Sequence, residues 1–266
     1  MSDAITLETD GPVATLTFNR PDARNALGAP GDGDLAAELC GRINANREIR
    51  CAILTGSGTA FSAGGNLKAM REQAGMFEGP GTAIADSYRT NVHRLVRAFW
   101  NLEVPLIAAV NGPAIGLGND IACMADTRIA ADTARFGATF LKIGLVPGDG
   151  GAWLLPRVIG MARAAELLYT GEIVGAETAR EWGLVSRVVP AADLMAEARA
   201  LAAKIAAQPP DVLRMTKRLL RESMRADFDT IMELSAASQA LAHHTEDHRE
   251  ALDAFLNKRD PVFRGR

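Results

Sequence analysis

Asn111-Gly-Pro-Ala-Ile-Gly-Leu-Gly-Asn-Asp120 is the stretch around which the chain is organised. It follows an apolar run, Val104 to Val110, that is typical of a buried strand, and it leads into a small-residue segment typical of a helix opening at Asp120. Its glycines let the backbone approach a ligand closely, and the free N–H groups at a helix start favour negative charge. The stretch therefore predicts a strand, a tight turn and an anion-stabilising loop.

The composition is that of an α/β enzyme. A chain of 266 residues can form one large domain or one domain with a helical appendage, and we favour the second. The net charge is -3 and the basic residues are scattered, which argues against nucleic acid or an anionic membrane as a partner. The first residues lack a targeting pattern and no apolar segment reaches about 18 residues, so we expect a cytoplasmic protein.

The order of elements predicts two parts. Ile5 to Thr9 and Val13 to Phe18 alternate apolar with polar residues and predict a hairpin, and short strands then alternate with helices as far as residue 190. Helical spacing predicts one helix from 83 to 101. Beyond Pro190, strand signals cease and helices are expected at 191–207, 210–224, 228–242 and 246–256. We therefore predict an α/β core over residues 1–190 and a helical region over 191–266.

Metal and dinucleotide sites are not indicated. The three cysteines have no CxxC spacing, which favours buried thiols. His244 and His248 have metal-type spacing but lack the glutamate of HExxH, and Phe61 stands where GxGxxG needs glycine. His93 lies off the apolar face of its predicted helix and is expected to be solvated. We predict no metal and no dinucleotide cofactor.

Three glycine-bearing loops resemble, in order and spacing, those of the crotonase (enoyl-CoA hydratase/isomerase) superfamily. They are Phe61-Ser-Ala-Gly-Gly-Asn-Leu-Lys68, residues 111–120 and Gly144-Leu-Val-Pro-Gly-Asp-Gly-Gly151, and the segments 20–27 and 254–266 are similar as well. The resemblance implies a spiral of ββα units followed by a helical trimerisation region, assembled as a homotrimer or a dimer of trimers. It also implies a coenzyme A thioester as substrate, with no separate cofactor.

The resemblance implies an oxyanion hole formed by the N–H groups of Gly65 and Leu117. Removing a proton next to a thioester, or adding water to its double bond, puts negative charge on the thioester oxygen, and each donor aimed at that oxygen is worth about 3 kcal/mol. Contacts to coenzyme A fall on Arg24, Ala63, Lys68 and Lys258. In the family the last commonly reaches from the C-terminal tail into a neighbouring site, and solvated surface charge is the alternative for the cations.

The catalytic carboxylates depart from the hydratase pattern. Hydratases of the family use two glutamates, which fall here on Asp120 and Phe140, and a phenyl ring carries no proton. Asp149 lies in a loop where some isomerases of the superfamily carry an acid, with the register shifted by about one residue. Beside Phe140 and Trp153, which we expect at the acyl pocket, its pKa would be raised. Helix capping is the alternative role for both aspartates.

We therefore predict an acyl-CoA enzyme that moves protons with Asp149, Asp120 or both. Isomerisation of an enoyl-CoA double bond ranks first, because one base suffices, whereas hydration must also place a water molecule. An enoyl-CoA hydratase with a non-standard acid/base pair ranks second. Retro-aldol, hydrolytic or dehalogenating chemistry, and an acyl-CoA binder without turnover, remain alternatives.

Overall fold

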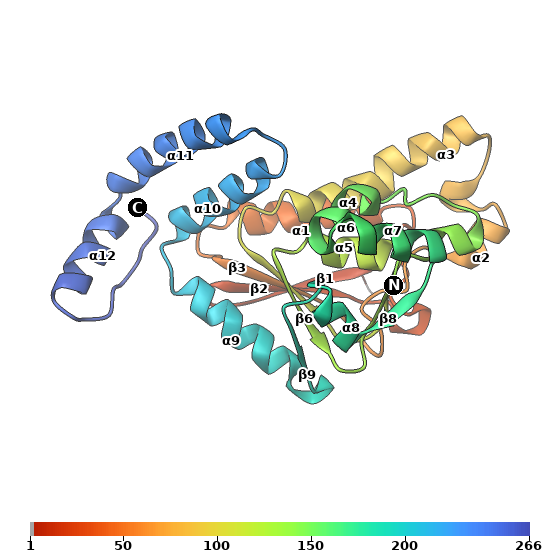
Figure 1. Ribbon diagram of the computed structural model, residues 1–266, viewed down its shortest axis with the longest axis horizontal. Helices are drawn as coiled ribbons and strands as arrows, with labels where there is room; N and C mark the ends of the chain where they lie inside the picture. The colour runs from red at the N-terminus through yellow and green to blue at the C-terminus, as the bar shows by residue number, and fades with distance from the viewer. Residues whose placement is uncertain (1–2) are drawn as a thin grey trace.

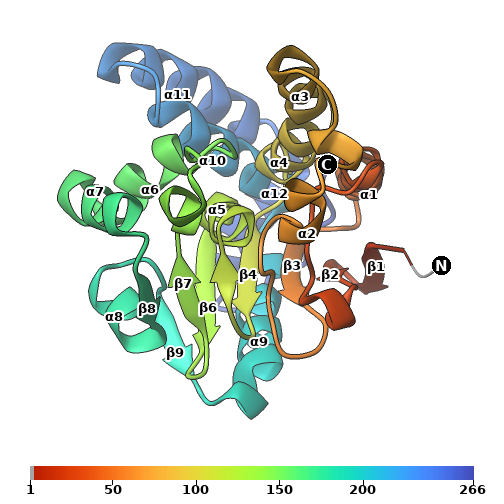
Figure 2. The ribbon, with the colours of Figure 1, turned by 90° about the vertical axis from the view of Figure 1, so that its right-hand side faces the viewer.

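The structure, a computed structural model, describes residues 3–266 and is built on two sheets (Figures 1 and 2). The large sheet contains β1 (Ile5–Asp10), β2 (Val13–Phe18), β3 (Cys51–Gly56), β4 (Leu106–Val110), β6 (Thr127–Ala131) and β9 (Arg187–Val189), in that order. β1 and β2 form the predicted antiparallel hairpin, and the later strands add in parallel. The small sheet has the order β5 (Ala114–Ile115), β7 (Arg135–Gly137), β8 (Ile173–Gly175).

Both faces of the large sheet are buried, because parallel strands here are covered by helices on each side. Along β3 and β4 successive side chains point to opposite faces. Leu54 and Ala108 face one hydrophobic core, with side chains of α1 (Asp32–Ala45) and α4 (His93–Trp100). Ile53 and Ile107 face the other, which α9 (Leu194–Ala206) covers. The sheet is thus held rigidly between two helical layers.

The remaining helices follow the predicted order with some shifted starts. They are α2 (Leu67–Arg71), α3 (Gly81–Ser87), α5 (Leu117–Met124), α6 (Gly151–Ile159), α7 (Met161–Thr170), α8 (Ala176–Glu181), α10 (Pro210–Ser223), α11 (Phe228–His243) and α12 (Glu246–Leu256). α5 begins at Leu117 rather than at the expected Asp120, since Gly116 precedes its first turn. α1 begins at Asp32, directly after Gly31, whose backbone is in the left-handed conformation.

The single helix expected from 83 to 101 is interrupted by a π-helical turn at Tyr88–Val92. There the N–H of His93 donates to the carbonyl of Tyr88, five residues earlier. A π turn inserts one residue and rotates the following side chains by about 100° relative to a continuous α-helix. The side chains after the turn therefore point in directions that a uniform helical spacing does not predict.

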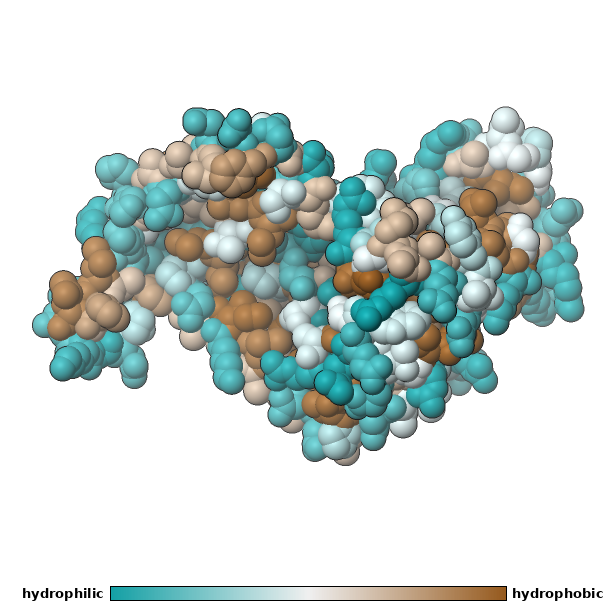
Figure 3. All heavy atoms as spheres, in the orientation of Figure 1, coloured by the Kyte–Doolittle hydropathy of each residue, from teal (hydrophilic) through white to brown (hydrophobic). Residues whose placement is uncertain are grey.

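The last three helices, α10, α11 and α12, leave the sheet and form an arm, which we call the C-terminal arm (Figure 1). Apolar residues are exposed along it (Figure 3), among them Phe228, Met232, Leu241, Leu252 and Phe255. α9 is different, because it packs on the large sheet although the sequence assigns it to the helical region. α10 also contacts the core, because the buried Lys217 donates to the carbonyl of Val104 at 2.7 Å and Arg214 pairs with Glu103 at 2.6 Å. Within residues 3–266, no helix is long and apolar enough to cross a membrane.

Candidate active site

A narrow pocket of about 120 Å³ lies where the three glycine-bearing loops meet. The predicted residues Ala63, Gly65, Leu117, Phe140 and Asp149 all line it. Most other lining residues are apolar, and they include Leu27, Met70, Met76, Phe77, Val92, Ile143 and Leu145. Among the described residues that line the pocket, Asp149 alone carries a carboxyl group. The pocket is therefore an apolar slot with a single acid.

Main-chain pairing brings the first two loops together. Ile115 N donates to Ser62 O at 2.9 Å, and Leu27 N donates to Gly64 O at 2.9 Å. Gly64 has a φ of +86°, and a Cβ there would lie 2.6 Å from the carbonyl oxygen of Ile115 and 3.4 Å from the nitrogen of Leu117. Only glycine fits this position, because a side chain would push the two loops apart.

Two backbone donors line the pocket without a partner. The N–H of Leu117 is the first of α5 and has no acceptor within the helix. Within the part of the chain that the structure describes, neither this N–H nor that of Gly65 donates a hydrogen bond. Since an unpaired amide in a pocket is costly unless a ligand or water takes it, both groups are available to a substrate oxygen. This arrangement can stabilise an oxyanion.

Asp149 presents a poorly solvated carboxyl group to the pocket. It is 6% exposed and stands just before Gly150, the N-cap residue of α6, and no side chain caps that helix. Burial raises the pKa of Asp149 to about 6, and the nearby His93 opposes this rise. A carboxyl group with such a pKa changes protonation near neutral pH, which suits an acid and base that works in both directions. Helix capping, the alternative role for Asp149, is therefore not seen in the described residues.

Asp120 lies behind the pocket rather than in its lining. It is fully buried, its Oδ2 accepts a hydrogen bond from Gly151 N at 2.9 Å, and its Oδ1 has no partner in the described residues. A Cβ at Gly151 would overlap both carboxyl oxygens, so the close approach requires glycine. Burial, and then the charge of Asp149, raise the pKa of Asp120 to about 8. Asp120, a residue of α5, therefore supports the start of α6.

The structure separates the two aromatic residues expected at the acyl pocket. The ring of Phe140 lines the pocket, and a Cβ at Gly116 would be 3.7 Å from it. Trp153 lies elsewhere, because the first turn of α6 directs it toward the end of α4. Its ring packs edge-on against Trp100 with centroids 5.3 Å apart and lies 4.1 Å beneath the guanidinium of Arg157. The placement of Trp153 at the pocket was wrong.

The cations expected at coenzyme A lie on the surface. Arg24 is exposed, and its carbonyl accepts a hydrogen bond from Ala63 N at 2.9 Å. Lys68 is exposed in α2, directly after the pocket residue Leu67. Lys258 follows α12, and Figure 1 shows α12 at the end of the molecule opposite α2. Arg24 and Lys68 thus neighbour the pocket of their own chain, and Lys258 does not.

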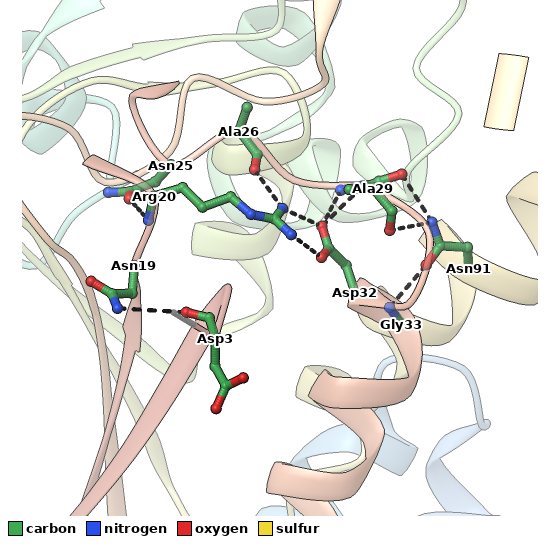
Figure 4. Close-up of polar contacts among 10 residues, drawn as sticks. Asp3, Asn19, Arg20, Asn25, Ala26, Ala29, Asp32, Gly33 and Asn91 are labelled. Atoms are coloured by element: carbon green, nitrogen blue, oxygen red, sulfur yellow. Dashed lines mark hydrogen bonds and ion pairs between the residues drawn. The ribbon is translucent and has the colours of Figure 1, made fainter. Parts of the chain in front are cut away.

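One wall of the pocket is fixed by a partly buried ion pair (Figure 4). Arg20 donates to the two oxygens of Asp32 at 2.8 and 2.7 Å, and Oδ2 of Asp32 also accepts from Gly28 N and Ala29 N, each at 2.9 Å. The side chain of Asn91 donates to the carbonyls of Gly28 and Ala29 at 2.9 and 3.0 Å. The loop that carries Gly28 is therefore held by hydrogen bonds to Asp32 through its N–H groups and to Asn91 through its carbonyls.

Sequence reasoning missed two residues beside Asp149. Tyr88 lines the pocket, and His93 is half-buried, with Nε2 at 2.9 Å from the carbonyl of Gly148. The expectation that His93 is solvated was wrong, because the π turn directs it toward the Asp149 loop. Helical spacing alone gives no signal for that turn. Among the other histidines, Nδ1 of His243 lies 3.0 Å from Nε2 of His248, and no cluster of three or more potential metal ligands is found within residues 3–266.

Comparison with known proteins places this site in a family. The sequence model described as enoyl-CoA hydratase/isomerase matches residues 8–266. The chain is 38% identical to the 1,2-epoxyphenylacetyl-CoA isomerase of Escherichia coli, with all of both chains covered. It is 36% identical to the short-chain-enoyl-CoA hydratase of Clostridium acetobutylicum, covering 96% of this chain and 95% of the relative. The chain belongs to the enoyl-CoA hydratase/isomerase family.

Solved structures agree with this assignment. The enoyl-CoA hydratase of Bacillus anthracis superposes with a TM-score of 0.92 at 32% identity, covering 99% of this chain and all of the other. The enoyl-CoA hydratase of Mycobacterium smegmatis gives a TM-score of 0.91 at 31% identity, covering 98% and 99%. The predicted crotonase-like α/β fold is confirmed, and the chain is an enzyme of the crotonase superfamily.

Proposed function

We propose that the enzyme moves the double bond of an enoyl-CoA thioester between the β,γ and α,β positions. The observation that carries this proposal is a pocket with two unpaired backbone donors and one carboxyl group. In it, the N–H groups of Gly65 and Leu117 bind the thioester oxygen. Asp149 transfers the proton.

The reaction needs one proton carrier and one site for negative charge. The Asp149 carboxylate takes a proton from the α carbon, the electron pair of that C–H bond moves into the conjugated system, and charge collects on the thioester oxygen. The two N–H groups stabilise that charge. The Asp149 carboxylic acid then returns the proton to the γ carbon. A pKa of about 6 allows both steps near neutral pH.

Hydration is the second candidate, because several relatives, such as that of Clostridium acetobutylicum, are named hydratases. It requires two groups that hold and split water, and the pocket offers one carboxyl group beside the phenyl ring of Phe140. Asp120 lies behind the lining with one oxygen bound to Gly151. Isomerisation therefore fits the pocket better than hydration does.

We further propose which residues bind coenzyme A and which surface joins the subunits. We assign Arg24 and Lys68 to its phosphates, since a cation beside a phosphate forms strong charge-assisted hydrogen bonds. The apolar surface of the C-terminal arm serves to join subunits into a trimer or a dimer of trimers. In such an assembly, Lys258 reaches the pocket of a neighbouring subunit.

The test is product analysis in deuterated water. With a 3-enoyl-CoA substrate, we expect the wild-type enzyme to form the 2-enoyl-CoA and to exchange α and γ hydrogens for deuterium, measured by mass spectrometry and NMR. A 2-enoyl-CoA substrate that gives chiefly 3-hydroxyacyl-CoA would favour hydration instead. Bound acyl-CoA without exchange or product would contradict both reactions.

A further inference from the structure

The π-helical turn Tyr88–Val92, with His93 after it, contacts three parts of the active site at once. Tyr88 and Val92 line the pocket directly. Asn91 holds the Gly28 loop through its side-chain amide. His93 approaches the loop that carries Asp149. Mid-helix π turns are rare and often occur at functional sites, which makes this turn a candidate for organising the pocket.

The contact of His93 defines the position of one of its protons. Its Nε2 lies 2.9 Å from the carbonyl oxygen of Gly148, and a carbonyl can only accept. The Nε2 atom therefore carries a hydrogen and donates it. Gly148 directly precedes Asp149, so this bond fixes the backbone from which the carboxyl group projects.

The ring of Tyr88 packs against both His93 and the loop that carries Asp149. The rings of Tyr88 and His93 meet edge-on with centroids 6.1 Å apart, and a Cβ at Gly148 would lie 3.6 Å from the Tyr88 ring. The Gly148–Asp149 loop is thus held by the ring of Tyr88 and by the hydrogen bond from His93. No other residue of the described chain donates a hydrogen bond to the carbonyl of Gly148.

We propose that His93 is a positioning residue for Asp149, which fixes the Gly148 carbonyl and holds an imidazole ring close to the loop that carries the carboxyl group. The inference rests on the proposed role of Asp149 as the proton carrier. Three titratable groups face Asp149: Tyr88 from the π turn, His93 from α4 and Asp120 from α5. Of these, His93 alone becomes a cation. His93 opposes the effect of burial on the pKa of Asp149.

Two substitutions separate the hydrogen bond from the charge. His93→Gln keeps an N–H donor without a cation, and His93→Phe keeps a ring without either. We expect His93→Phe to lower kcat about 10- to 100-fold, as loss of positioning does, while His93→Gln retains most of kcat. In both variants the acidic limb of the kcat/KM profile, expected near pH 6 in the wild type, should move to higher pH. Arg94→Gln is the matched control, since this exposed cation is the next residue in α4 and pairs with Asp34 on the surface.

A measurement that does not depend on turnover distinguishes this inference from the proposed function. The carboxyl carbon of Asp149, labelled with ¹³C and assigned by its absence in Asp149→Asn, is titrated by NMR in each variant. A higher midpoint in both His93 variants, with the Arg94→Gln midpoint unchanged, supports the inference even if Asp149 proves not to be the base. Wild-type midpoints and unchanged pH profiles in His93→Gln and His93→Phe would overturn it, as would equal shifts in all three variants.

Discussion

The buried carboxyl groups on the two sides of the pocket differ in how many hydrogen bonds they receive. On the side of the Gly28 loop, Asp32 receives hydrogen bonds on both oxygens, from Arg20 and from two backbone amides. On the other side, Asp120 has one bonded and one unpartnered oxygen, and Asp149 has no hydrogen bond within the described residues. A fully paired carboxylate holds structure, whereas burial without such pairing raises the pKa of Asp120 and Asp149. The first side is therefore a scaffold and the second is suited to proton transfer.

The largest expected effect is that of Asp149→Asn. An amide cannot take a proton from the substrate, so isomerisation and deuterium exchange should fall by about 10²- to 10⁴-fold, the usual contribution of a general base. The midpoint of thermal unfolding should stay the same or rise, because a buried charge is removed. Activity within a factor of about two of the wild type would contradict the role of Asp149.

Next in size is the effect of Asp32→Asn on stability. The variant loses the charge that Arg20 and two amides bind, so we expect a loss of about 2 to 3 kcal/mol in the free energy of unfolding, measured with urea. The cost is limited because the Arg20 side chain is 32% exposed and can regain water. The control Asp34→Asn, an exposed residue of the same helix, should cost no more than about 1 kcal/mol. Equal losses in the two variants would show that the buried pair is not structural.

Gly64→Ala tests the fit of the two loops that carry the backbone donors Gly65 and Leu117. The added Cβ meets the carbonyl of Ile115 and strains a backbone with positive φ, so the loops that carry Gly65 and Leu117 move apart. We expect a loss of about 10²-fold in kcat, as for one lost oxyanion donor. Gly41→Ala is the control, because this exposed α1 residue has open space at its Cβ and should retain full activity. An active Gly64→Ala enzyme would contradict the fit of the two loops.

In Asp120→Asn we expect a changed pH dependence of stability. The pKa of Asp120 is about 8 in the folded protein and about 4 when unfolded, so the unfolded chain releases this proton first as pH rises. The wild type therefore loses stability between about pH 4 and pH 8 through this group, and the variant does not. The difference in unfolding temperature, variant minus wild type, should increase from pH 5 to pH 8. A constant difference would show that Asp120 does not titrate there.

Most of the scaffold could be predicted from the sequence, because glycine spacing constrains the backbone directly. Gly64 and Gly116 mark the loops that meet, and the hairpin and the long helices follow from their periodicity. Strands β5, β7, β8 and β9 have two or three residues each, too few for an alternating pattern.

The proton-transfer side could be predicted only in part. Asp149 was found from its loop, but the position of Asp120 behind the lining depends on where α5 begins, three residues before it. His93 and Trp153 were misplaced because their directions depend on the π turn and on the first turn of α6. Side-chain direction after an irregular turn is a property of tertiary packing, which a single sequence does not state.

The central claim is that two distant backbone amides bind one thioester oxygen opposite Asp149. A crystal structure of the enzyme with an unreactive acyl-CoA analogue tests it most directly. The account predicts the thioester oxygen within about 3 Å of both Gly65 N and Leu117 N, with an oxygen of Asp149 facing the α or γ carbon. A thioester oxygen bound by other groups, or a carboxyl group of Asp149 turned away from the acyl chain, would contradict it.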